Sequence, residues 1–598
     1  MGPLVSEVEV SPEQGGNGPE QGANRPEQGV NGPRPSLGGH EAKDSSAPQH
    51  SSVADVVGAT LAAQGVKDAF GVLGSGNLVV TNALCRHGAQ FHHARHEMSA
   101  TCMADGYARV TGRVGVVSVH QGPGLTNTMT GLAEAAKSRT PVLVLAGETP
   151  AAALTSNFRI DQHDLVESVG AIADRVHSAR TAADDATRAY QRAVTERRPV
   201  VLMLPIDIQP QPAVQTEPSA PPLPALTPPA PPTEAITQAA DLIVRAQRPA
   251  IIAGRGAVLA DAGDDLERLG ERIGAVLATS APANGLFAGL PYALGISGGF
   301  ASPFAAKTLP QADVVLVFGA SVNHWTTKHG AMIAPDAKII QIDLEPRAIA
   351  RNRPANVAIL ADARATARAL SDELIKRDHA NQGFRTPELS EEIAANTWRH
   401  DPYEDASTED TIDPRTASIA LNELLPHNKA VAVDSGHFLG YPSMFLEVPD
   451  ARSWLFPNGF QAVGLGLGNA IGAAIARPDR PTVAAIGDGG AFMALAELET
   501  AARLKLTLLV VIYDDAAYGA EVHHFAPMGH DVSLVRFPDA DLAGIARAAG
   551  AKAATVRRVD DLGIVTEWLA NPHGPLVLDV KVNPTICAEW LEEAFRAG

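Results

Sequence analysis

The sequence predicts an α/β protein made of three doubly wound parallel-sheet domains. The first observation is that short apolar runs, typical of buried strands, alternate with stretches of helical apolar spacing. The second is that two segments lack this pattern and divide the chain. The third is the length of 598 residues, which at roughly 100–200 residues per domain allows three or four domains. We divide the chain into a tail at 1–50, domains at 51–208, 233–375 and 413–598, and linkers at 209–232 and 376–412.

The tail and the first domain differ in composition. A seven-residue repeat, PEQGGNG, PEQGANR and PEQGVNG, occupies residues 12–32. It contains Pro and Gly and lacks an apolar seam, so it predicts a disordered tail. Apolar strands begin after Ser51. In the first domain they are predicted at Phe91–Ala94, Val114–Val119, Val142–Ala146 and Val200–Leu204.

The remaining elements follow two linkers. Ten prolines among the 24 residues at 209–232 predict a stiff, extended connection. Polar, weakly periodic sequence at 376–412 indicates the second linker. Strands are predicted in the central domain at Ala250–Ala253, Val314–Phe318 and Lys338–Ile342, and in the third domain at Ala430–Val433, Thr482–Ile486 and Leu508–Tyr513.

The composition excludes several classes of function. With 67 acidic and 48 basic side chains the formal net charge is −19, which repels phosphate backbones and anionic membranes, so we expect no nucleic-acid or membrane partner. Cys85, Cys102 and Cys587 are too few for a disulfide framework and lack metal-ligand spacing. No apolar run is long enough to predict a membrane span, and no signal-peptide pattern is present. We expect a cytoplasmic protein that acts on a small molecule.

A glycine-rich turn in the third domain predicts an anion site. The strand Thr482–Ile486 runs into Gly487, Asp488, Gly489 and Gly490, and a helix is predicted from Ala491 to about Leu504. Glycines between a strand and a helix let backbone N–H groups approach an anion closely. A phosphate would be repelled by Asp488 unless a cation lay between them, so this aspartate indicates a divalent metal.

The next strand supplies a second carboxylate. It ends in Asp514-Asp515-Ala516-Ala517-Tyr518-Gly519. Neighbouring parallel strands place their carboxyl ends side by side, so Asp488 and Asp515 can converge on one Mg²⁺ ion. The alternative interpretation of the two segments, taken separately, is an ordinary tight turn and a solvated acidic loop.

The spacing of these motifs resembles the signature of thiamine-diphosphate-dependent enzymes, in which GDG is followed at a set interval by a polar pair, usually Asn-Asn. Asp488 and Asp515 are 27 residues apart. The resemblance implies that Asp488, Asp515 and the carbonyl of Ala517 hold Mg²⁺ on the cofactor diphosphate, which Gly487, Gly489 and Gly490 approach. The chain departs from the pattern by carrying Asp-Asp, which adds a charge.

A thiamine cofactor also needs a carboxyl group that protonates its pyrimidine ring, which calls for a glutamate with a raised pKa in an apolar pocket. The first domain contains HE-x-x-A-x-x-x-A-D-G-Y-A-R at 96–109 and QGPGLTN at 121–127. These motifs resemble the pyrimidine-binding domain of the acetolactate-synthase-like group, and the match carries the activating role to Glu97. A solvated glutamate in the first turn of a helix is the alternative.

The resemblance covers about residues 51–584. It implies that the first domain binds the pyrimidine and the third domain the diphosphate and Mg²⁺. In this family the two halves of the site come from different subunits, which implies a homodimer or homotetramer with the active site between subunits. It also implies that the Gln461 carbonyl accepts a hydrogen bond from the cofactor and that Val463 is an apolar wedge beneath it. Plain core packing is the alternative for Val463.

The residues expected near the reacting carbon indicate the reaction. Glu521 follows the second metal ligand by six residues, where acetolactate synthases carry an apolar residue and pyruvate-type decarboxylases carry a Glu. An acid there can protonate the product and release an aldehyde, or handle protons during carboligation. We predict catalytic roles for Glu97, Glu521, His120 and Gln121, and substrate contacts for Ser75, His523 and His524.

The sequence of the central domain does not identify a ligand for this domain. Gly254-Arg255-Gly256 follows a strand but lacks the full dinucleotide fingerprint and its acidic partner. Acetolactate synthases bind FAD in this domain partly through an Arg, and this chain has Ser321 at that place. FAD and an ADP-like ligand, as in 2-hydroxyacyl-CoA lyases, both stay open.

We therefore expect a Mg²⁺- and thiamine-diphosphate-dependent, acetolactate-synthase-like enzyme that decarboxylates a 2-oxo acid. The remainder would be released as an aldehyde or joined to a second carbonyl compound. One alternative is a 2-hydroxyacyl(-CoA) or acyloin lyase that works without decarboxylation. An alternative of another class is a cofactor-binding relative without catalytic activity.

Overall fold

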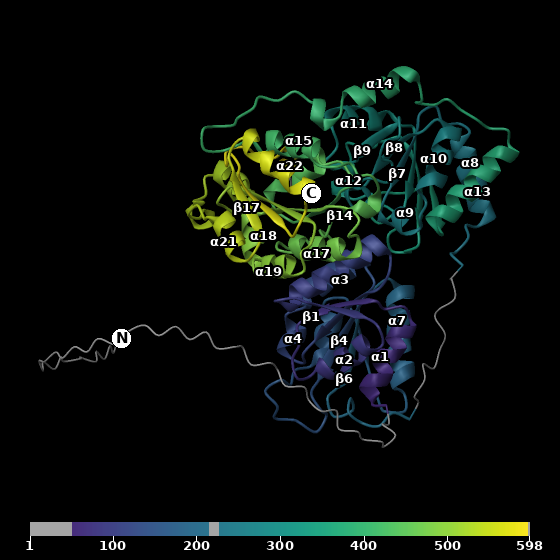
Figure 1. Cartoon of the computed structure of the whole chain (residues 1–598). Coiled ribbons are helices and arrows are strands. Elements are labelled where there is room, and N and C mark those ends of the chain that lie inside the picture. The colour runs from purple at the N-terminus through teal and green to yellow at the C-terminus, as the bar shows by residue number, and fades with distance from the viewer. Residues whose placement is uncertain (1–50, 215–226, 596–598) are drawn as a thin grey trace, which may run out of the picture. The chain divides into compact units, whose positions relative to one another are not determined.

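The computed structural model describes residues 51–214 and 227–595 and contains three six-stranded sheets in these ranges, in which every strand pair is parallel (Figure 1). The predicted fold class is confirmed. The predicted tail at 1–50 and residues 215–226 of the proline-rich linker lie outside the described residues. Within the described ranges, no helix has the length and apolar character needed to cross a bilayer.

The first domain, purple to blue in Figure 1, has the strand order β2-β1-β3-β4-β6-β5. Its central strands are apolar and buried along their whole length, as expected where helices cover both faces of a parallel sheet. The strands are β1 Asp68–Gly71, β2 Gln90–His93, β3 Gly115–Val119, β4 Val142–Glu148, β5 Ile172–Arg175 and β6 Val200–Pro205. The helices are α1 Val53–Ala63, α2 Leu78–Arg86, α3 Glu97–Thr111, α4 Pro123–Thr126, α5 Met129–Lys137, α6 Gln162–Ser168 and α7 Ala182–Glu196.

The central domain has the order β12-β11-β10-β7-β8-β9, which is the order of dinucleotide-binding sheets. Its strands are β7 Pro249–Ala253, β8 Val276–Thr279, β9 Ala293–Ile296, β10 Val314–Phe318, β11 Lys338–Asp343 and β12 Val357–Leu360. Its main helices are α8 Thr233–Ile243, α9 Arg255–Leu259, α10 Gly263–Ile273, α11 Pro303–Thr308, α12 His324–Thr327 and α13 Ala363–Lys376.

The third domain repeats the strand order of the first, as β14-β13-β15-β16-β18-β17. Its strands are β13 Ala430–Val433, β14 Trp454–Leu455, β15 Thr482–Gly487, β16 Leu508–Asp514, β17 Lys552–Val556 and β18 Leu576–Lys581. Its helices are α15 Pro414–Leu424, α16 Gly440–Phe445, α17 Gly466–Ala476, α18 Asp488–Met493, α19 Glu497–Arg503, α20 Gly519–Phe525, α21 Leu542–Ala548, α22 Gly563–Ala570 and α23 Glu589–Phe595.

Both predicted linkers contain ordered structure. The amides of Val53 and Ala54 donate to the carbonyls of Gln211 and Gln209, so the start of the predicted proline-rich linker is hydrogen-bonded to the first domain. The segment at 376–412 holds helix α14 Pro387–Ala395, whose Ile393 is buried in the core of the central domain. Hydrogen bonds and buried apolar side chains fasten both stretches to their neighbours, which composition alone did not reveal.

The helix predicted from Ala491 to about Leu504 is wrong at its start and in its middle. It begins at Asp488, so Gly489 and Gly490 are helical, and it is broken at residues 494–496 into α18 and α19. The break places Glu497 beside the first domain, where its carboxylate accepts from the backbone N–H groups of Arg95 and His96, both at 3.0 Å. These contacts orient α19 separately from α18.

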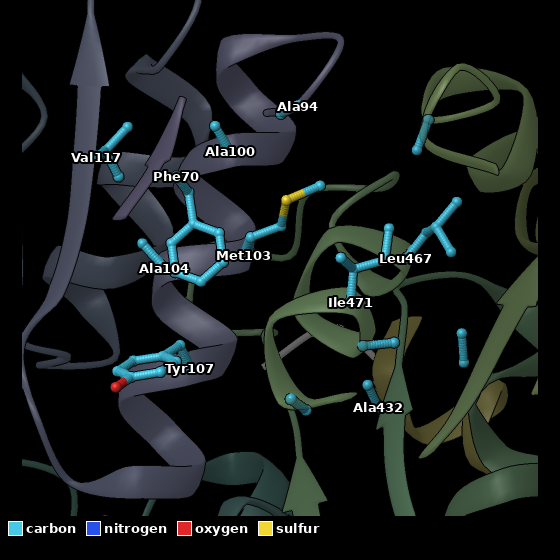
Figure 2. Close-up of a cluster of buried hydrophobic side chains, with 14 of the residues drawn as sticks. Phe70, Ala94, Ala100, Met103, Ala104, Tyr107, Val117, Ala432, Leu467 and Ile471 are labelled. Atoms are coloured by element: carbon cyan, nitrogen blue, oxygen red, sulfur yellow. The ribbon is translucent and has the colours of Figure 1, made fainter. Parts of the chain in front are cut away.

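Helices α3 and α17 join the first and third domains through one apolar core. Figure 2 shows Met103 of α3 directed at Leu467 and Ile471 of α17, all three buried. A Cβ at Gly472 would lie 1.9 Å from the Met103 carbonyl oxygen, and one at Gly106 would lie 2.2 Å from that of Asn469. Glycine at both positions is therefore required for the two backbones to approach this closely.

Candidate active site

A pocket of the third domain lies where the strand order reverses, between β13 and β15. Open α/β sheets bind ligands at this position, outside the carboxyl ends of their strands. The pocket is lined by turns that follow four strands. These turns contribute Ser435 and Gly436 after β13, Asp488 and Gly490 after β15, Asp515 and Ala517 after β16, and Val582 and Asn583 after β18.

The two predicted metal-ligating carboxylates meet in this pocket. Burial, followed by the repulsion of Asp515 and Asp514, raises the pKa of Asp488 to about 8. Burial and the charge of Asp514 raise the pKa of Asp515 to about 7. The charge of Arg536 opposes the pKa shift of Asp515 without removing it, and a divalent cation between the two carboxylates would restore their charged form. The donor set of carboxylate and backbone oxygens fits Mg²⁺.

The turn that carries Asp515 has a defined backbone conformation. Ala516 adopts a left-handed conformation with φ of 52°, and its N–H donates to Oδ1 of Asp514 at 3.0 Å. The N–H of Ala517 donates to Oδ1 of Asp515 at 3.2 Å. Backbone bonds from Tyr518 to Val535 and from Phe537 to Ala516 fix the turn from the other side. The first aspartate of the Asp-Asp pair thus shapes the turn that presents the second.

Asp434 is a site residue that the sequence reasoning missed. It follows β13 and is buried, and its carboxylate accepts from the N–H groups of Gly464 at 2.9 Å and Leu465 at 3.2 Å. Burial raises its pKa to about 6, although these backbone bonds oppose the shift. Asp434 thereby holds the segment that contains Val463, which lines the pocket and is 36% exposed. Its position at a strand end where the order reverses is the signal that could have identified it.

A buried ion cluster holds the other end of this segment. Arg109 binds Asp105 at 2.7 Å and Glu134 at 2.9 Å, and all three side chains are almost fully buried. The other carboxylate oxygen of Glu134 accepts from the N–H of Phe460 at 2.7 Å. Asp105 and Arg109 belong to the motif at 96–109, so part of this motif links the first domain to residues 458–464 of the third.

His437 lines the pocket and is held by the C-terminal segment. Its Nε2 accepts from the N–H of Ala588 at 2.8 Å, and its carbonyl accepts from the Trp590 indole at 3.2 Å. Burial, followed by the nearby His523, lowers the pKa of His437 to about 3. The neutral ring therefore carries its hydrogen on Nδ1, which lies 3.9 Å from Oδ2 of Asp515. No sequence signal marked this residue.

The predicted residues of the first domain lie elsewhere, and among the described residues none of that domain lines the pocket. Glu97 opens α3 and accepts from the Asn127 amide at 2.9 Å. Ser75 and His120 lie together, with Ser75 Oγ 3.2 Å from His120 Nε2. Gln121 is buried, with its side-chain oxygen between Gly76 and Gly147.

The His120 ring has a preferred tautomer. Its Nδ1 lies 2.8 Å from the Gln121 carbonyl oxygen, which can only accept, so Nδ1 carries the hydrogen. In the neutral ring Nε2 is then the acceptor for the Ser75 hydroxyl. The structure brings together this predicted pair at the end of β3, where the first sheet reverses its order.

The three predicted residues of α20, Glu521, His523 and His524, do not line the pocket. Its member Ala520 lines the pocket, and Glu521 follows it. His523 packs against His437 with ring centres 4.4 Å apart. His524 stacks on Phe595 of α23 at 3.9 Å. Gln461 also lies outside the lining and has a left-handed backbone with φ of 61°, which turns the chain before Val463.

The glycine turns of the central domain pack against each other. A Cβ at Gly254 would lie 2.3 Å from the Gly319 carbonyl oxygen, and one at Gly256 would lie 2.7 Å from the Gly319 Cα. Arg255 between them donates to Thr140 of the first domain at 3.0 Å. These residues therefore serve close packing where the central sheet reverses its order, and FAD or ADP binding there stays a prediction.

Comparison with known families covers all three domains. Residues 51–168 match the N-terminal TPP binding domain of thiamine pyrophosphate enzymes. Residues 236–370 match the central domain and residues 434–580 the C-terminal TPP binding domain of the same enzymes. The three matches occur in the order expected for the family.

Curated relatives are similar along most of the chain. Sulfoacetaldehyde acetyltransferase of Alcaligenes xylosoxydans xylosoxydans is 32% identical over 538 residues, which cover 84% of this chain and 88% of the relative. A probable 2-ketoarginine decarboxylase of Pseudomonas aeruginosa is 32% identical over 523 residues, covering 84% and 89%. A probable acetolactate synthase large subunit of Methanocaldococcus jannaschii is 28% identical over 546 residues, covering 89% and 92%. Together with the domain matches and the pocket geometry, these similarities show that the chain belongs to the thiamine pyrophosphate enzyme family.

Proposed function

We propose that the protein is a Mg²⁺- and thiamine-diphosphate-dependent enzyme that decarboxylates a 2-oxo acid. The remainder of the substrate is released as an aldehyde or joined to a second carbonyl compound. The observation that carries this proposal is the pocket in which Asp488, Asp515 and Ala517 meet beside the glycine turn at 487–490. The family assignment indicates thiamine diphosphate as the cofactor. The pocket contains the residues that we propose as ligands of Mg²⁺.

The roles of the pocket residues follow from their chemistry. Asp488, Asp515 and the carbonyl of Ala517 would hold Mg²⁺ against the diphosphate. The turn at Gly487, Gly489 and Gly490 gives the backbone room to approach it. Val463 exposes an apolar side chain at the pocket, where it would support the cofactor on the segment that Asp434 fixes.

Glu97 would come from a second copy of the chain. Glu97, Ser75 and His120 lie outside the pocket that holds Asp488 and Asp515. Large apolar side chains are exposed on both parts, including Phe158 in the first domain and Phe460 and Phe492 in the third. Exposed apolar side chains of this size can contribute to an interface between chains. A homodimer or homotetramer would cover them and bring the two halves of the site together.

The chemistry is divided between cofactor and protein. Bound thiamine diphosphate would supply a nucleophilic carbon for the substrate carbonyl and a cationic ring that takes up the electron pair left when carbon dioxide departs. Glu97 holds a proton at the pyrimidine ring. Glu521, adjacent to the pocket on α20, delivers a proton to the product. The Ser75–His120 pair offers a hydroxyl group and a ring nitrogen for hydrogen bonds to the substrate.

Binding and turnover test the proposal together. Calorimetric titration should show that thiamine diphosphate binds in the presence of Mg²⁺. Pyruvate, longer 2-oxo acids and aromatic 2-oxo acids should then be supplied while released carbon dioxide is measured. Glu97→Gln should lower turnover by about a thousandfold or more while the circular dichroism spectrum stays unchanged. Full turnover in this variant, or no cofactor binding in the parent protein, would reject the proposal.

The names of the relatives give a second candidate. Sulfoacetaldehyde acetyltransferases are among the similar proteins, so sulfoacetaldehyde belongs in the substrate panel. Consumption of this aldehyde without release of carbon dioxide would support transfer or lyase chemistry instead. A 2-hydroxyacyl-CoA lyase is tested in the same assay by supplying a 2-hydroxyacyl thioester and measuring the aldehyde formed.

A further inference from the structure

Lys581 ends β18 directly opposite Asp514 in the parallel register. Its Nζ donates to Oδ2 of Asp514 at 2.6 Å, to Oδ1 of Asp539 at 2.5 Å and to the carbonyl of Ala540 at 2.8 Å. The side chains of Lys581 and Asp514 are 8% and 3% exposed. All three ammonium hydrogens are used, and the ion pair is shielded from water.

Asp514 in turn fixes the backbone that presents the proposed metal ligands. Its Oδ2 pairs with Lys581, which leaves Oδ1 to accept from the N–H of Ala516. Ala516 has a left-handed backbone, which is strained for an alanine and needs support from its surroundings. Asp515 and Ala517 stand on either side of this residue. A shift of Asp514 would therefore move both proposed ligands.

The Lys581–Asp514 ion pair also offsets the negative charge of the aspartate at position 514. An asparagine at position 514 would accept the same hydrogen bond from Ala516 without adding charge. Asp514 instead adds a negative charge next to Asp515 and Asp488, where a diphosphate would bind. Asp579 is fully buried 3.1 Å from Lys581 Nζ and adds a further carboxylate. The ammonium group of Lys581 offsets this excess, because it lies within ion-pair distance of both buried carboxylates, 2.6 Å from Asp514 and 3.1 Å from Asp579.

We propose that Lys581 is a positioning residue that, through Asp514, holds the turn Asp515–Ala517 in its ligating conformation and offsets the charge that Asp514 brings to the diphosphate site. This inference rests on the proposed function. It explains how the chain uses Asp-Asp where related enzymes carry Asn-Asn. Lys581 acts through Asp514 and is not expected to contact the substrate.

The test measures thiamine diphosphate affinity at saturating Mg²⁺ by calorimetry, so it does not depend on turnover. Lys581→Met leaves two buried carboxylates without their cation and should weaken binding at least about tenfold. The double variant Asp514→Asn/Lys581→Met removes the charges of this pair, keeps the acceptor for Ala516 and leaves Asp579 as the one buried carboxylate without its cation. It should bind at least about threefold more tightly than Lys581→Met, because the two changes are coupled. Lys552→Met, an exposed lysine on β17, is the matched control and should bind as the parent does.

A second pair of variants keeps the test decisive if Lys581→Met does not fold. Asp514→Asn retains the hydrogen bond to Ala516 and should retain affinity, whereas Asp514→Ala removes it and should lose affinity about tenfold. Equal affinities in this pair, a folded Lys581→Met that binds normally, or a double variant as weak as Lys581→Met would each overturn the inference. A parent protein that binds no thiamine diphosphate would instead overturn the proposed function.

Discussion

Three aspartates of the third domain lie in surroundings that disfavour the charged form of the carboxyl group. Asp434, Asp488 and Asp515 are all buried and have raised pKa values. The Asp434 carboxylate accepts hydrogen bonds from backbone N–H groups, whereas Asp488 and Asp515 line the pocket. The free energy lost by burying Asp488 and Asp515 can be recovered when a divalent cation binds, which couples stability to ligand binding.

Asp488→Asn should raise the stability of the protein measured without metal and cofactor. An aspartate in the unfolded chain has a pKa of about 3.9, and burial raises that of Asp488 to about 8. The folded protein therefore retains a proton that the unfolded chain has lost, and stability falls as pH rises from about 4 to about 8. The asparagine side chain has no proton to lose, so the variant should unfold roughly 2 °C or more above the parent at pH 8.

Scanning calorimetry at pH 6 and pH 8, with and without Mg²⁺ and thiamine diphosphate, checks this expectation. The advantage of Asp488→Asn should be smaller at pH 6 than at pH 8. Added Mg²⁺ and thiamine diphosphate should stabilise the parent but not the variant. The exposed Asp372→Asn serves as the control. A variant that gains as much from the ligands as the parent does would contradict the assignment of Asp488 as a metal ligand.

At the scale of elements, two helices determine how the halves of the chain pack. Helices α3 and α17 touch backbone to backbone at glycines, and their apolar side chains form part of a core shared by the first and third sheets. Each helix also begins next to functional residues: α3 with Glu97 and α17 after the segment that contains Val463. Their contact therefore sets the position of both.

Gly472→Ala should destabilise the protein by about 2 kcal/mol or more, because its Cβ would overlap the Met103 carbonyl oxygen and force the helices apart. Urea unfolding followed by circular dichroism measures the change. Gly563→Ala at the start of α22 is the matched control, since no atom lies within 4 Å of the added Cβ. It should leave stability unchanged or slightly raised. Equal stabilities for the two variants would show that the helix contact can relax.

At the scale of the whole molecule, the first and third sheets share one strand order, and each has predicted site residues where that order reverses. The first domain contributes Glu97, Ser75 and His120, and the third domain contributes Asp488 and Asp515. One chain holds these two sets apart. A symmetric pair of chains that joins unlike halves would complete two equivalent sites.

Complementation between two inactive variants tests this arrangement. Glu97→Gln and Asp488→Asn should each be inactive alone. In a mixed dimer, one site combines both substitutions and the other combines neither. Random exchange should thus restore about a quarter of the parent activity. Activity is measured before and after mild dissociation and reassociation of the mixture, and each variant treated alone is the control. Lack of any recovery after verified exchange would place the whole site within one chain.

Much of the architecture could be predicted because buried parallel strands appear in the sequence as short, continuous apolar runs. The runs at Val314–Phe318 and Ala430–Val433 became β10 and β13 without change of bounds. The pairing of Asp488 with Asp515 was also predictable, since adjacent parallel strands end side by side. The break between α18 and α19 was not, because contacts of Glu497 with the first domain decide it. Asp434, His437 and Lys581 were missed for the same reason: their partners are distant in sequence.

The sequence alone determined the fold class, the family resemblance and the motif aspartates, because strand periodicity and motif spacing are local properties of the chain. Tertiary structure alone decided which residues support that site. Burial raises the pKa values of Asp488 and Asp515, distant backbone amides orient Asp434, and β18 brings Lys581 to Asp514. The tertiary structure also places Glu97, Ser75 and His120 of the first domain outside the pocket. These outcomes depend on distances and on exclusion of water, which follow only from packing the three sheets together.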